Sequence, residues 1–100
     1  MQEKVYRLLE KSGTKTAPMI RLVDINSELG ELSKEILKKT NYGKTSYSIP
    51  DAAVQMEYGD TLFSVIALGV ELGLDIETSL GVALKKYEAR LEKKGHIGSN

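Results

Sequence analysis

Residues 57–70 of the chain read EYGDTLFSVIALGV, and this segment indicates the class of fold more clearly than any other. After Asp60 the apolar residues cover the whole circumference of a helix. Such a helix is buried on every side or on every side but one, so we expect its own chain and a neighbouring chain to cover it. Glu57 and Asp60 stand one turn apart at its entrance. Ionised carboxylates beside a dry core are costly unless they are paired, hydrogen-bonded or bound to a metal.

Three other segments have helical periodicity, and no segment alternates as a strand does. The third helix should carry Pro50 in its first turn and Asp51 beside its positive end. Asp75 is an N-capping carboxylate for the fourth helix. We therefore expect one all-α domain over residues 1–100, a bundle of about four helices that is oligomeric. The expected helices span about residues 2–12, 17–40, 50–72 and 75–94.

The composition limits the class of protein. The chain has 14 basic and 14 acidic residues, so it lacks the basic excess with which proteins usually bind nucleic acid. It has no cysteine, which removes disulfides and cysteine-based zinc sites. No apolar secretory core follows Met1, and no uncharged run reaches the roughly 20 residues that cross a bilayer. We expect a cytoplasmic protein with no membrane or nucleic-acid partner.

The second expected helix gathers acidic residues on one face, within about 60° on a helical wheel. Like charges at these spacings repel by a few tenths of a kcal/mol per pair. We predict that no basic side chain relieves this repulsion, because Arg21, Lys34 and Lys38 are assigned to other faces. The acidic residues are Asp24, Glu28, Glu31 and Glu35.

Two acidic pairs, Glu28-x-x-Glu31 and Glu57-x-x-Asp60, should face each other across an antiparallel helical hairpin. Hard oxygen ligands suit Mg²⁺ or Mn²⁺, and Mg²⁺ shares its coordination with substrate phosphates. Either pair alone is typical of a solvated helix face. The two pairs together, one of them opening an apolar helix, predict a metal site that serves phosphate chemistry.

The order of these acids resembles the signature of the MazG-like family of nucleotide pyrophosphohydrolases, which is E-x-x-E, a variable spacer and E-x-x-D. The resemblance extends from about residue 20 to residue 99. It is carried by five blocks in order, namely SELGEL (27–32), EYGDTL (57–62), LGLDIE (72–77), KYEARL (86–91) and GHIGS (95–99).

The resemblance implies an all-α bundle that assembles as a homodimer or a dimer of dimers. Such proteins hydrolyse a nucleoside triphosphate to the monophosphate and pyrophosphate with Mg²⁺. Glu28, Glu31, Glu57 and Asp60 would be the metal ligands. Either Glu28 or Glu31 would also act in catalysis by orienting or deprotonating the attacking water.

Lys86 and Arg90 lie one turn apart in the fourth helix and are candidates for binding substrate phosphates. Basic residues late in a helix are also favoured by the helix dipole alone. Tyr58 is a candidate for stacking on the base, with ordinary packing as the alternative. Many family members carry asparagine two residues before the lysine, where this chain has Leu84, which leaves nucleotide preference open.

The sequence is also compatible with three alternative functions. A phosphoribosyl-ATP pyrophosphohydrolase would use the same fold and acids, and so would a pyrophosphatase specific for dCTP or dUTP. A non-catalytic helical bundle that binds a protein through its third helix belongs to a different class.

Overall fold

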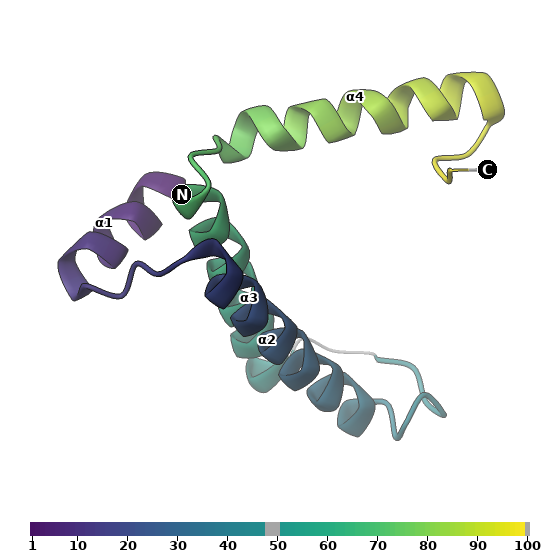
Figure 1. Cartoon of the computed structure of the whole chain (residues 1–100). Coiled ribbons are helices and arrows are strands. Elements are labelled where there is room, and N and C mark those ends of the chain that lie inside the picture. The colour runs from purple at the N-terminus through teal and green to yellow at the C-terminus, as the bar shows by residue number, and fades with distance from the viewer. Residues whose placement is uncertain (48–50, 100) are drawn as a thin grey trace.

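The computed structural model describes residues 1–47 and 51–99. These residues form four α-helices and no strand (Figure 1), which confirms the all-α prediction. Pro50, expected in the first turn of the third helix, lies outside the described residues. None of the described helices combines the length and the apolar character needed to cross a membrane. The helices are α1 (Gln2–Ser12), α2 (Pro18–Lys39), α3 (Ala52–Glu71) and α4 (Ile76–Lys94).

Local chemistry explains where the helices begin. The Asp51 side chain accepts hydrogen bonds from the backbone N–H of Ala53 (2.9 Å) and of Val54 (3.2 Å), which satisfies donors at the start of α3. Asp75 does the same for α4 through Thr78 N–H at 2.9 Å. Because these caps depend on one side chain each, the sequence alone locates the helix starts to within two residues.

α2 and α3 form an antiparallel hairpin whose two ends are held by ion pairs (Figure 1). Lys39 at the end of α2 lies 3.2 Å from Asp51 at the start of α3. Arg21 near the start of α2 lies 3.0 Å from Glu71 at the end of α3. This arrangement sets the middle of α2 opposite the middle of α3.

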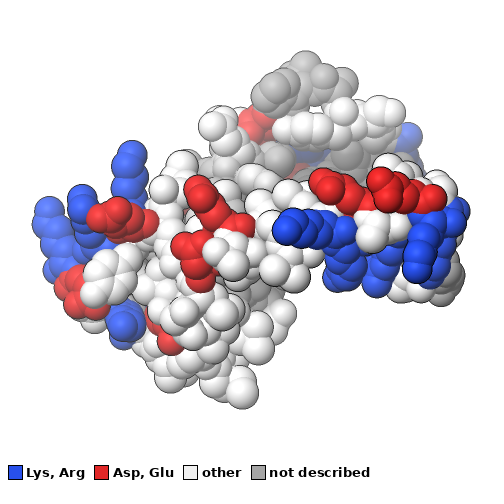
Figure 2. All heavy atoms as spheres, turned by 90° about the horizontal axis from the view of Figure 1, so that it is seen from above, with Lys and Arg blue, Asp and Glu red and all other residues white. Residues whose placement is uncertain are grey.

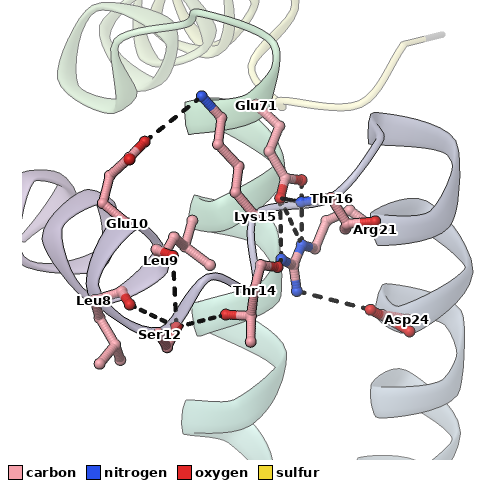
Figure 3. A network of polar contacts seen from close by, with 10 residues as sticks. All are labelled: Leu8, Leu9, Glu10, Ser12, Thr14, Lys15, Thr16, Arg21, Asp24 and Glu71. Atoms are coloured by element: carbon pink, nitrogen blue, oxygen red, sulfur yellow. Dashed lines mark hydrogen bonds and ion pairs between the residues drawn. The ribbon is translucent and has the colours of Figure 1, made fainter.

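The Arg21–Glu71 pair is buried and belongs to a wider polar network (Figure 3). The side chains of Arg21 and Glu71 are 8% and 1% exposed. Arg21 also donates to the carbonyl of Thr14 at 3.2 Å, and Thr16 N–H donates to Glu71 at 2.9 Å. Burial raises the pKa of Glu71, but the hydrogen bonds from Arg21 and Thr16 outweigh it and hold that pKa below its usual range. The network therefore fixes the segment before α2 to the end of α3.

α1 packs against the second half of α3, where Val5, Leu9, Ile66 and Ala67 form the buried core. α4 has a different environment. Only its first residue, Ile76, packs against this core, and the rest of the helix projects away from the other three (Figure 1).

α3 is not covered on every side within one chain. Leu62 and Val65 are 43% and 47% exposed, although the sequence pattern predicts a helix surrounded by protein. That a neighbouring chain covers the remaining face stays a prediction.

Candidate metal centre

Carboxylates of α2 and α3 meet at the middle of the hairpin. Glu28 comes from α2, and Glu57 and Asp60 come from α3. Each offers one oxygen atom, and these three oxygens lie within 4.8 Å of one another. Glu28 and Glu57 are half-buried, whereas Asp60 is exposed and leaves the cluster open to solvent on one side.

The three carboxylates fit a divalent cation. Their oxygens are hard ligands of the kind that Mg²⁺ prefers. Among three oxygens on one octahedral Mg²⁺ ion, at most one pair lies about 4.2 Å apart and the other pairs lie about 3 Å apart, so the side chains of the cluster would close in around a bound ion. One open side also suits Mg²⁺, which keeps waters or substrate oxygens in part of its coordination shell.

The electrostatics of the cluster also favour a bound cation. Burial raises the pKa of Glu57 above its usual value, and the negative charges of Asp60, Glu31, Glu28 and Glu35 raise it further. Among the described residues, no ion pair reaches Glu28, Glu57 or Asp60. The cluster is thus a concentration of like charge that a bound cation would neutralise.

Glu31 is the member of the predicted ligand set that the structure does not bring into the cluster. It lies one turn after Glu28 on α2 and is close enough for its charge to raise the pKa of Glu57. The structure therefore assembles three of the four predicted acids and places the fourth beside them.

The prediction that no basic side chain relieves the acidic face of α2 is wrong at both ends of that face. Arg21 approaches Asp24 to 3.7 Å, and Lys38 approaches Glu35 to 3.5 Å. A helical wheel treats side chains as fixed spokes, whereas arginine and lysine bend along the helix to reach a residue three positions away. The uncompensated charge is consequently confined to the middle of the hairpin, where the cluster lies.

Lys86 and Arg90 lie on α4, and the structure does not bring them to the acids of the same chain. Their charged groups instead flank the ring of Tyr87, 4.8 Å and 5.7 Å from its centroid. Arg90 also donates to the carbonyl of Ile97 at 3.3 Å. Figure 2 shows α4 as an arm with basic side chains along one side and acidic side chains along the other.

Tyr58 and Leu84 are both open to solvent. Tyr58 follows Glu57 directly on α3 and is 61% exposed. Leu84, which stands at the family's usual asparagine position, is 50% exposed on α4 and contributes no amide there.

Sequence reasoning missed the Arg21–Glu71 pair, although a signal was present. Glu71 ends a helix that has no other charged residue from Thr61 onward, and a carboxylate in that position needs a partner. The partner is 50 residues away in sequence, so local spacing does not identify it.

Comparisons of the chain with protein-family models, with curated proteins and with solved structures give no match. The features of the chain that point to a function are therefore the carboxylate cluster and the five sequence blocks that resemble the MazG-like family.

Proposed function

We propose that this chain is a Mg²⁺-dependent nucleoside triphosphate pyrophosphohydrolase. It would hydrolyse a nucleoside or deoxynucleoside triphosphate to the monophosphate and pyrophosphate, as part of nucleotide-pool housekeeping. The observation that carries the proposal is the cluster of Glu28, Glu57 and Asp60, whose oxygens converge from two facing helices with no basic partner in the part of the chain that the structure describes. The resemblance to the MazG-like family supports the choice of a triphosphate substrate.

Glu28, Glu57 and Asp60 would hold the metal. When bound, Mg²⁺ neutralises charge on the triphosphate and lowers the pKa of water. Glu31 lies beside the cluster and outside it, so its carboxylate is available to orient a water molecule and take its proton. The water oxygen attacks the α-phosphorus, the bond to the bridging oxygen breaks, and pyrophosphate leaves. Glu28 is the second candidate for orienting this water.

The remaining predicted residues would bind the rest of the substrate. Lys86 and Arg90 supply positive charge for the phosphates. Tyr58 offers an exposed aromatic face to the base. The working assembly would be a homodimer or a dimer of dimers, because a single chain leaves apolar side chains of α3 and α4 exposed.

Substitution of single ligands tests this proposal. We expect Glu57→Gln and Asp60→Asn to lower kcat/KM by at least about 100-fold, since residues that merely support a metal ligand already contribute about 10–100-fold. Pyrophosphate release should be measured over natural NTPs and dNTPs, including dCTP and dUTP, and over phosphoribosyl-ATP. The preferred substrate in this panel separates the general enzyme from the two narrower ones.

Glu35→Gln is the matched control, because Glu35 lies on the same face of α2 but pairs with Lys38 outside the cluster. It should retain nearly all activity. A folded Glu57→Gln or Asp60→Asn protein with near-wild-type turnover would contradict the site assignment.

A further inference from the structure

The direction of α4 is fixed by the turn that precedes it. Gly73 adopts a left-handed conformation (φ 73°), and Leu74 N–H donates to the carbonyl of Gly69 at 2.8 Å. The Gln2 side chain then clamps the turn, because its amide nitrogen donates to Leu74 O at 2.7 Å and its amide oxygen accepts from Ile76 N–H at 2.6 Å. α1 thus holds the start of α4, and the rest of α4 projects away from the hairpin (Figure 1).

This geometry separates the basic residues of α4 from the acids of the same chain. At 1.5 Å per residue, Lys86 lies roughly 15 Å along α4 from Ile76. Asp60 lies roughly 16 Å along α3 from Glu71. α3 and α4 diverge from the clamped turn (Figure 1). Asp60 on α3 and Lys86 on α4 therefore lie on separate arms of the molecule.

α4 carries a surface that needs a partner. Its apolar residues Leu80, Leu84, Tyr87 and Leu91 recur at spacings of four, three and four, which is the pattern of a helix that packs against another helix. All four are exposed, by 37–56%. Lys86, Arg90 and Lys93 flank this stripe on one side, and Glu77, Glu88 and Glu92 on the other.

The acidic face of the hairpin has the complementary character. Glu28, Glu57 and Asp60 supply negative charge without a basic partner among the described residues. Ile20 and Met56 lie one turn before Asp24 and Asp60, on the same faces of α2 and α3, and are 56% and 66% exposed. This surface therefore offers apolar contacts beside an unneutralised acidic cluster.

From these two surfaces we infer that α4 of one copy of the chain lies across the acidic face of a second copy, so that Lys86 and Arg90 serve the partner's site. The occupant is another copy because the clamped turn keeps each α4 away from its own hairpin. The basic flank of α4 is also complementary in charge to the unneutralised acids of the hairpin, and one two-fold exchange brings both pairs of surfaces together. The role of Lys86 and Arg90 in binding phosphate rests on the proposed function, whereas the exchange itself does not.

Cross-linking tests the exchange without any activity measurement. The chain has no cysteine, so each variant carries a single thiol. A chain with Met56→Cys is co-expressed with a differently tagged chain with Lys86→Cys, and a short bifunctional maleimide is added. Glu88→Cys is the matched control, because it lies on the opposite flank of the same helix. We expect the mixed product with Lys86→Cys to form roughly tenfold faster than with Glu88→Cys, owing to its higher effective concentration.

Equal rates for the two α4 positions, or no product between chains, would overturn the inference. A single chain with both Met56→Cys and Lys86→Cys that cross-links within itself would also overturn it, since α4 would then serve its own hairpin.

Complementation connects this geometry to the proposed function. Glu57→Gln and Arg90→Ala chains are each expected to have little activity alone. If the site is shared, a mixed dimer has one site with intact acids and an intact arginine, and random mixing restores up to about a quarter of wild-type activity. If α4 serves its own chain, mixing restores none. A wild-type protein without hydrolytic activity would refute the proposed function, and the cross-linking result would still decide the inference.

Discussion

Glu57 is the residue at which the electrostatics of the site converge. Its pKa is raised by burial and by four neighbouring carboxylates. A group with a raised pKa in the folded state favours folding below its unfolded pKa, about 4.3 for glutamate, and loses this contribution as the pH rises through the folded value. At neutral pH without metal, the ionised Glu57 therefore works against the fold.

Because ionised Glu57 destabilises the folded state, its removal should stabilise the metal-free protein. In EDTA at pH 7, Glu57→Gln should raise the melting temperature, because it removes one charge from the cluster. The gain should shrink as the pH falls through the raised pKa of folded Glu57, and it should vanish below about 4, where the wild-type carboxyl is protonated in both the folded and the unfolded state. Added Mg²⁺ should raise the melting temperature of the wild type, since it binds only the folded state, and should have little effect on Glu57→Gln. Circular dichroism melts between pH 3 and 7 measure both effects, and a less stable Glu57→Gln protein in EDTA would contradict this account.

The Glu71 carboxylate, which pairs with Arg21, affects stability in the opposite way to Glu57 as the pH changes. The pKa of Glu71 lies below its usual value despite burial, because Arg21 and Thr16 donate hydrogen bonds to the carboxylate. The stability from this pair is therefore present above the unfolded pKa and is lost as the pH falls through the folded one.

Breaking this pair from one side should be severe. Arg21→Met would leave the Glu71 carboxylate, 1% exposed, without its counter-charge, and such losses amount to about 3–5 kcal/mol. The double substitution Arg21→Met/Glu71→Met should recover part of this loss, because no buried charge remains. Urea unfolding at pH 7 measures both. A single variant as stable as the wild type would show that the pair does not hold the hairpin.

At the scale of the elements, the positions of the helices and of their ends were predicted best from the sequence. The N-cap Asp75 and a helix through the apolar run after Asp60 depend on neighbours within one turn, and both were predicted correctly. Asp51 was expected only as a charge beside the positive end of the third helix, and the structure shows that it is the N-cap. The meeting of Glu28, Glu57 and Asp60 was also predictable, because an antiparallel hairpin brings the middles of its helices together. The position of Glu31 outside the cluster depends on rotation of α2 about its axis, which residue spacing fixes only coarsely.

The cap of α3 provides a test at this level. Asp51 accepts two backbone hydrogen bonds and also pairs with Lys39. Its side chain therefore stabilises both the start of α3 and the contact between α3 and the end of α2. Asp51→Ala removes both contributions and should lower the melting temperature. Asp51→Asn keeps the capping oxygen and loses only the ion pair, so it should lower the melting temperature less. Equal effects of the two substitutions would show that the cap contributes nothing.

At the scale of the whole molecule, the direction of α4 could not be predicted from the sequence. Gly73 and the clamp by Gln2 determine it, and Gln2 lies 72 residues from Leu74. The resulting molecule has a thin core, in which Leu9 is the one large side chain that is fully buried among the described residues. Much of the apolar surface of α3 and α4 remains exposed, as expected of a small chain whose core is completed by association.

The products formed from a nucleoside triphosphate show whether the chain is a pyrophosphohydrolase. Phosphorus NMR of the wild-type protein with the preferred triphosphate and Mg²⁺ should show nucleoside monophosphate and pyrophosphate in equal amounts, and EDTA should abolish both. Release of orthophosphate, turnover that persists without divalent metal, or no turnover with any triphosphate in the panel would contradict the claim.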